Sequence, residues 1–330
     1  MNTSPHRQRG VALLVALLVV ALAVILIAAL LDRGELAFAR TRNLLRSEQA
    51  DAYAQGLEIY AAQILFKTES EQRGPDSNRS PWALPLPPQQ VPGGLISATM
   101  RDLNGCFNLN NLSGRSPDAA RWLDVFNQLL LALGIPDPML AASVQAWLGA
   151  GDGANVLSPN TYLSLPIPYR QRGDVFVHVS ELRLVAGVTT DVYAKLAPYV
   201  CALPPGTKIN VNTASVPVLQ SLTSRISRAA AIAIWNNGQA NMTSVTDVAT
   251  QAHIDQSLLP PASMIGTSST YFLARGDIIL DEVPFTFYSL IERAGNGHNY
   301  RVLARSRGSD DALTVAAPIA ASPRDDGTLD

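Results

Sequence analysis

The clearest pattern along the chain is an apolar run near its beginning. The 21 residues from Val11 to Leu31 include no charged residue, no proline and no glycine. At about 1.5 Å per residue, a helix of this length spans the roughly 30 Å hydrocarbon core of a bilayer. Arg7 and Arg9 precede the run and Asp32 follows it, so the positive-inside rule leaves the short N-terminus in the cytoplasm. The run is therefore predicted to be a membrane anchor, with the rest of the chain on the other side.

Beyond the run, apolar residues recur at helical spacing as far as Gln72. One predicted stripe consists of Leu36, Leu44, Tyr53, Leu57, Tyr60 and Ile64. We therefore expect one continuous helix that is half in the membrane and half packed on a globular body. The segment from Gly74 to Gly94 carries six prolines and three glycines, which predicts a loop.

The remaining patterns are strands, then many short helices, then strands. Strand-like residues and an Asn-Gly turn occupy residues 95–112. The helical patterns begin at Ser116, expected as an N-cap with Pro117 in the first helical position. Strand patterns return at Tyr271, and the last two strands are joined at Gly-Asn-Gly-His. This order predicts an α+β fold with a long N-terminal helix, a small antiparallel sheet and a large all-helical insertion.

Composition narrows the function classes. The chain has 330 residues, of which 47% are apolar and 16% charged, and its formal net charge is −2. A chain without a basic excess is not expected to bind nucleic acid. Its two cysteines, Cys106 and Cys201, lie in the exported part. In an oxidising compartment they indicate one disulfide, and the alternative is two buried free thiols.

Nothing in the sequence indicates catalysis. The four histidines are scattered, and no nucleophile elbow, zinc-protease or P-loop pattern occurs. Residues 209–238 are similar to half of a helix-hairpin-helix module, but its hairpin lacks glycine and offers only Arg225 and Arg228. We therefore expect a structural role there, with Asn212 or Thr213 capping a helix, and no enzyme activity.

Four stretches together resemble a known family. A short basic peptide ending at Gly10, followed directly by the apolar helix, resembles a prepilin-type leader. The internal stretches are DLNGCFNLNNL (102–112), VSELRLVAG (179–187) and INVNTASVPVLQSL (209–222). In this order they are similar to minor pseudopilin K of type II secretion systems, the general secretion pathway protein K family.

The resemblance implies a structural role in secretion. A prepilin peptidase is expected to cut after Gly10 and to leave Val11 as an N-methylated amino terminus. The implied protein is anchored in the inner membrane with its body in the periplasm. It then initiates and caps the tip of the pseudopilus with minor pseudopilins I and J, for export of folded proteins across the outer membrane. Other implied partners are the major pseudopilin below the tip, inner-membrane lipid, and a secreted substrate or the outer-membrane secretin.

The fifth mature position supports a place at the tip. Most pilin-like helices carry a glutamate there, whereas this chain has Val15. In the family picture, that glutamate neutralises the amino terminus of the subunit above. An unpaired charge in an apolar core is costly, so only a subunit with nothing above it can do without the carboxylate. The rival interpretations are a minor pilin-like subunit of a type IV pilus or competence system, and a membrane-anchored periplasmic enzyme.

The pilin-like fold implied by the resemblance divides the chain into six parts. They are a leader (1–10), the long helix (11–73, with 11–31 in the membrane), a loop with the first strands (74–115), a helical insertion (116–265), returning strands (266–307) and a disordered tail (308–330). Family members often bind calcium in an acidic loop. Here Asp152 and Asn160 are the only candidate ligands left, too few for the six to eight oxygens that Ca²⁺ prefers. We therefore expect no cofactor and a solvated turn.

Overall fold

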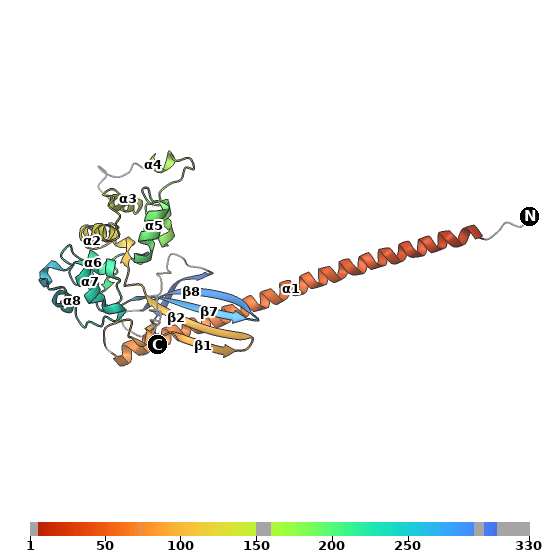
Figure 1. Cartoon of the computed structure of the whole chain (residues 1–330), viewed down its shortest axis with the longest axis horizontal. Coiled ribbons are helices and arrows are strands. Elements are labelled where there is room, and N and C mark those ends of the chain that lie inside the picture. The colour runs from red at the N-terminus through yellow and green to blue at the C-terminus, as the bar shows by residue number, and fades with distance from the viewer. Residues whose placement is uncertain (1–5, 73, 150–159, 294–299, 309–330) are drawn as a thin grey trace, which may run out of the picture. The chain divides into compact units, whose positions relative to one another are not determined.

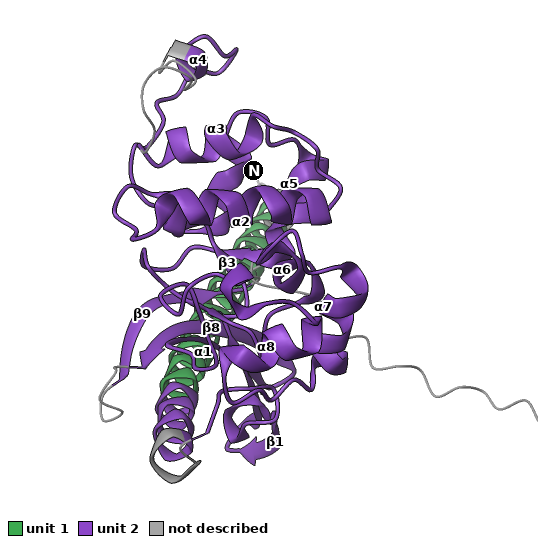
Figure 2. Ribbon diagram, turned by 90° about the vertical axis from the view of Figure 1, so that its left-hand side faces the viewer, with its two compact units in different colours: residues 1–55 green, residues 56–330 purple. Residues whose placement is uncertain are grey.

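The structure is a computed structural model that describes residues 6–72, 74–149, 160–293 and 300–308. Contacts divide the chain into two compact units, residues 1–55 and residues 56–330 (Figure 2). Each unit is described by itself.

Helix α1 (His6–Gln72) is the long N-terminal helix that the apolar pattern predicts (Figure 1). Its large aliphatic side chains between Val11 and Leu31 are 53% to 72% exposed. By length and composition, α1 is long and apolar enough to cross a membrane.

An antiparallel five-stranded sheet forms the centre of residues 56–330, in the order β1-β2-β7-β8-β9. The strands are β1 (Leu86–Val91), β2 (Gly94–Asp102), β7 (Tyr271–Leu280), β8 (Val283–Arg293) and β9 (Tyr300–Arg307). Asp281 and Glu282, both with positive φ, form the two-residue turn from β7 to β8, as tight hairpins require. The predicted Gly-Asn-Gly-His connection lies outside the described residues.

The prediction of a loop over the whole proline-rich segment is wrong, because β1 lies inside it. Pro87 and Pro88 belong to this strand. A proline has no N–H for the ladder, so it fits only an edge strand, and β1 pairs on one side only, with β2. Gly94 begins β2, where a Cβ would lie 1.7 Å from the carbonyl oxygen of Ile279.

The last turns of α1 cover one face of the sheet. Ala61 and Leu65 pack with Trp82, Phe272 and Ile291. The other face carries Tyr271, Leu273 and Tyr288 in a second cluster, as expected from the alternation of side chains along strands.

The buried stripe of α1 is rotated from the predicted one. Leu57 is buried, but Tyr60 is 41% exposed and Leu44 is 60% exposed. Ala61 and Ala62 are buried on this face together with Leu57 and Leu65. Gly276 provides room for this packing, since a Cβ on it would lie 2.9 Å from Leu57.

Several short helices lie in the described part of residues 56–330 and are grouped apart from the sheet (Figure 1). They are α2 (Ala119–Ala132), α3 (Leu140–Trp147), α4 (Asn160–Leu163), α5 (Thr190–Leu196), α6 (Val216–Ser221), α7 (Arg228–Trp235) and α8 (Val245–Ala252). Phe107, Trp122 and Phe126 belong to their common core. The α+β fold class is thereby confirmed, whereas the six predicted segment boundaries stay predictions.

One local prediction for these helices is wrong. Helix α2 begins at Ala119 after Asp118, so Ser116 and Pro117 are neither its cap nor its first turn. Two short parallel pairs also join distant segments: β3 (Phe107–Asn108) pairs with β4 (Val200–Cys201), and β5 (Ile209–Asn210) pairs with β6 (Ile265–Gly266).

Candidate functional site

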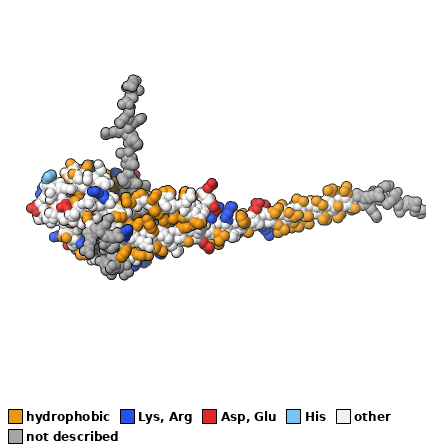
Figure 3. Space-filling view, turned by 90° about the horizontal axis from the view of Figure 1, so that it is seen from below, with side chains coloured by type: hydrophobic (Ala, Val, Ile, Leu, Met, Phe, Trp, Pro, Cys, Tyr) orange, Lys and Arg blue, Asp and Glu red, His pale blue; other side chains and the backbone are white. Residues whose placement is uncertain are grey.

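The predicted processing and anchoring residues lie on α1. Gly10 belongs to the helix, and Val11 and Val15 are 62% and 53% exposed. Figure 3 shows hydrophobic side chains along this part of the chain. Because no carboxylate occurs between Val11 and Leu31, the surface of this helix offers dispersion and hydrophobic contacts only.

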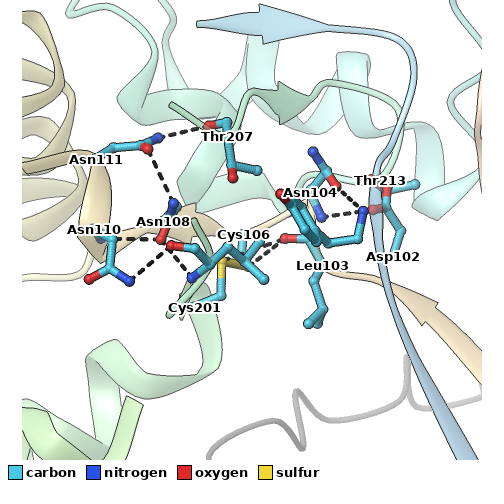
Figure 4. The surroundings of a disulfide bond; sticks show 12 residues. Asp102, Leu103, Asn104, Cys106, Asn108, Asn110, Asn111, Cys201, Thr207 and Thr213 are labelled. Carbon is cyan, nitrogen blue, oxygen red and sulfur yellow. Dashed lines mark hydrogen bonds between the residues drawn. A yellow bond between two sulfur atoms is a disulfide. The ribbon is translucent and has the colours of Figure 1, made fainter. Parts of the chain in front are cut away.

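The two cysteines form a disulfide, as expected. Cys106 follows β2 and Cys201 ends β4, and their Cα atoms are 5.9 Å apart (Figure 4). The bond links segments that are 95 residues apart in the sequence. It lies beside Leu103 and Leu203 in the cluster on one face of the sheet.

The first motif of the family resemblance forms a network of buried amides beside this disulfide. The side chain of Asn108 accepts from the backbone N–H of Leu203 at 2.9 Å and donates to the carbonyl of Pro204 at 2.9 Å. Asn110 donates to the carbonyls of Phe176 and Leu203, both at 2.9 Å. Such amide side chains stabilise loops by pairing with backbone groups that have no partner in a helix or sheet.

Further asparagines complete this network. Asn111 donates to the carbonyl of Thr207, and Asn104 donates to the carbonyl of Lys208 at 2.9 Å. Asn104 also accepts from the backbone N–H groups of Thr270 and Tyr271. These contacts join the segment after β2 to segments about 100 and 170 residues away, so the motif is structural rather than ligand-binding.

The motif at 209–222 has the same role. Asn212 accepts from and donates to the backbone of Met242, at 2.7 Å and 3.0 Å. It therefore does not cap a helix, and α6 begins after Ser215. Asn210 donates to Asp102 at 3.1 Å and also to Ser269.

A buried carboxylate cluster was missed by sequence reasoning. Asp102 is 7% exposed and accepts from Asn104, Asn210, Thr213 and Ser269. Burial raises the pKa of Asp102 to about 6, although the hydrogen bonds from Ser269, Thr213 and the backbone N–H of Asn104 oppose the rise. The donors that surround this carboxyl all belong to the same body of the chain, so its contacts are those of a structural group.

Asp76 forms the second part of this cluster. Its carboxylate pairs with the guanidinium of Arg293 and accepts from the backbone N–H of Ser269 at 2.8 Å. It also accepts from the indole N–H of Trp82 at 3.1 Å. Asp76 lies in the proline-rich segment, where no pattern distinguished it, whereas Asp102 could have been noticed because it opens the DLNG motif.

The outer face of α1 offers a surface for a partner. Within residues 56–330, Ile59 is 49% and Phe66 is 45% exposed. They are seven residues apart and therefore share one face of the helix. Leu57 and Ala61 are buried on the nearly opposite face. This arrangement can recognise another apolar helix, and its chemistry is recognition rather than group transfer.

The calcium candidates are not tested by the structure. Asp152 lies outside the described residues, and Asn160 begins α4. Among the residues that the structure describes, no group of three His, Cys, Asp or Glu side chains could hold a metal ion.

Comparison with known proteins identifies the family. A family model described as type II secretion system (T2SS), protein K, matches residues 105–205. Type II secretion system protein K of Pectobacterium carotovorum subsp. carotovorum is 36% identical over 222 residues, which are 63% of this chain and 67% of the relative. The protein of the same name from Pseudomonas aeruginosa is 36% identical over 232 residues, covering 65% of this chain and 68% of the relative.

A solved structure supports the same assignment. One chain in the crystal structure of the GspK-GspI-GspJ complex from the enterotoxigenic Escherichia coli type 2 secretion system matches with a TM-score of 0.70. The sequence identity is 27%, and the match covers 82% of this chain and 99% of that chain. The apolar helix and these matches together indicate a single-pass, membrane-anchored protein and do not favour a type IV pilus subunit or an enzyme. The chain therefore belongs to the type II secretion system protein K family of minor pseudopilins.

Proposed function

We propose that this chain is the first and topmost subunit of the type II secretion pseudopilus. The observation that carries the proposal is the apolar segment from Val11 to Leu31, which lacks any carboxylate and has Val15 at the fifth mature position. An amino-terminal cation in an apolar filament core needs an anion from the subunit below. A subunit without that anion cannot neutralise the amino terminus of a subunit above it. It therefore fits the tip and starts the filament.

The proposal includes processing and location. A prepilin peptidase cuts between Gly10 and Val11, and Val11 is then N-methylated. The anchor lies in the inner membrane and the body in the periplasm, an oxidising compartment in which the disulfide between Cys106 and Cys201 is stable. The arginines before the anchor support this orientation.

The proposed partners are the minor pseudopilins I and J. The related Escherichia coli chain was solved in a complex of GspK, GspI and GspJ. The face of α1 with Ile59 and Phe66 is the proposed contact, because two exposed apolar side chains in heptad spacing suit helix packing. Together the three subunits would cap the filament during export of folded proteins.

The N-terminal sequence of the mature chain tests the processing step. The chain purified from membranes is expected to start at N-methylated Val11, and to start at Met1 when the prepilin peptidase is absent. A chain that keeps residues 1–10 in the presence of the peptidase contradicts the proposal and favours the alternative of a membrane-anchored periplasmic enzyme.

Co-purification tests the helix face. Ile59→Arg is expected to prevent co-purification with I and J, whereas Leu258→Arg, at an exposed position on the helical part, is expected to leave it unchanged. Leu57 is unsuitable for this test, because it is buried against the sheet and an arginine there would damage the fold. Unchanged co-purification of Ile59→Arg would reject this face as the contact.

A further inference from the structure

An open groove of about 910 Å³ lies within residues 56–330, between the end of β2 and the helices. Met100, Leu133, Tyr199, Val216 and Trp235 contribute apolar side chains to its lining. Its volume is near the upper end of the range for ligand pockets, about 300–1,000 Å³. It can therefore hold several side chains of another chain.

The charge in this groove is positive. Arg101, Lys195 and Arg228 line it, and Asp102 is the one carboxylate among its described lining residues. Asp102 is buried beneath the surface and engaged by four donors. Within the described part of the chain, neither Lys195 nor Arg228 has an ion pair. The potential at the groove therefore attracts anions.

A third feature of the groove is an unpaired hydroxyl group beneath its surface. Ser215 belongs to the lining of the groove, and its hydroxyl oxygen is buried without a hydrogen-bond partner among the described residues. Ser215 precedes α6 but makes no capping bond with it. Buried polar groups are ordinarily paired, so this hydroxyl is unusual among the described residues.

We propose that the groove is a docking site for an acidic segment of a neighbouring pseudopilin subunit. The inference rests on the proposed function, which places such subunits beside this chain. Carboxylates of the segment pair with Lys195 and Arg228, and its apolar side chains contact Tyr199 and Trp235. The contact lies between the end of β2 and the helices, and its lining does not include Ile59 or Phe66 of α1.

Photocross-linking in cells tests the site. In the full chain, expressed with the secretion system, Tyr199 is replaced by p-benzoylphenylalanine, and the cross-linked segment is identified by mass spectrometry. The expected product joins this position to an Asp- and Glu-rich segment of a neighbouring pseudopilin. In the same background, Lys195→Glu with Arg228→Glu is expected to lower the yield about fivefold or more. The matched control, Lys195→Arg with Arg228→Lys, is expected to keep the yield within about twofold.

Several results would overturn the inference. The inference fails if position 199 cross-links to residues 309–330 of the same chain, to a secreted protein, or to a segment without an excess of acidic residues. It also fails if charge reversal leaves the cross-linking yield unchanged, or if no cross-link forms. Co-purification of the chain with I and J from the same cells separates the two proposals. If the complex forms and the groove does not cross-link, only the docking site fails, whereas loss of the unsubstituted complex rejects the proposed function.

Discussion

Arg305 donates two hydrogen bonds of 2.8 Å to the two carboxylate oxygens of Glu58, which joins α1 to β9. Ser289 on β8 donates a third bond to Glu58 at 2.9 Å. The Glu58 side chain is 10% exposed and that of Arg305 is 64% exposed. The pair therefore links the last turns of α1 to the sheet, and its carboxylate end is largely shielded from solvent.

Glu58→Gln is expected to destabilise residues 56–330 by about 1.5–3 kcal/mol, the usual contribution of a hydrogen bond to a charged group. Urea unfolding of the detergent-solubilised chain measures the loss. Glu48→Gln, at an exposed position of the same helix, is the matched control. Equal unfolding midpoints for the two variants would show that the pair contributes nothing.

The same pair has a defined pH dependence. Its hydrogen bonds to Arg305 hold the pKa of Glu58 below the ordinary value of 4.5. A carboxylate with a lowered pKa stabilises the fold above its unfolded pKa and loses this contribution as the pH falls through the folded pKa. The stability difference between the unsubstituted chain and Glu58→Gln should therefore be constant above pH 4.5 and shrink below it. A difference that grows on acidification contradicts this account.

Asp102 is expected to behave in the opposite direction. Its pKa is raised from 3.8 to about 6 by burial, so the folded chain binds this proton more tightly than the unfolded chain. Its contribution is fully present below pH 3.8 and is lost as the pH rises through 6. The free energy of unfolding of the unsubstituted chain, relative to that of Asp102→Asn, should therefore increase as the pH is lowered from 7 to 4. Parallel pH profiles for the two proteins would refute the shift.

Loss of the disulfide should be costly. Cys106→Ser with Cys201→Ser opens a loop with a sequence separation of 95. The chain-entropy relation gives about 4–5 kcal/mol for a loop of that length. Unfolding of the unsubstituted chain with and without a reductant should reproduce the difference. If the reductant leaves the unfolding midpoint unchanged, the disulfide does not stabilise the fold.

Gly94→Ala is expected to disrupt the pairing of β2 with β7. The added Cβ would lie 1.7 Å from the carbonyl oxygen of Ile279, which is backbone and cannot rotate away. We expect a loss of about 3 kcal/mol, at the upper end for overpacking. Gly114→Ala is the control, because a Cβ there meets nothing within 4 Å. Equal stability of the two variants would contradict the observed register.

The elements that the sequence predicted well have strong local patterns. The apolar run of α1 and the alternation in β7, β8 and β9 each depend on neighbouring residues only. Strand β1 was missed because its two prolines imitate a loop, and only its place at the sheet edge makes them acceptable. The buried face of α1 was misjudged in part, because Ala61 and Ala62 are buried there whereas Leu44 and Tyr60 of the predicted stripe are exposed.

The polar interior was not predictable for a different reason. Asn110 and Asn212 bond to backbone groups 66 and 30 residues away. The local sequence pattern does not reveal partners that are so distant along the chain. The family motif could therefore be recognised, but the role of its asparagines in linking loops could not be derived. The same holds for the contact of Asp76 with Arg293, which are 217 residues apart.

The position of this chain on isolated pseudopili tests the central proposal most directly. Filaments assembled in cells and labelled with an antibody against residues 56–330 should carry the label at one end only, on chains that begin at Val11. Label distributed along the shaft would contradict the account, because a subunit with valine in place of the fifth-position glutamate would then have other subunits stacked above it.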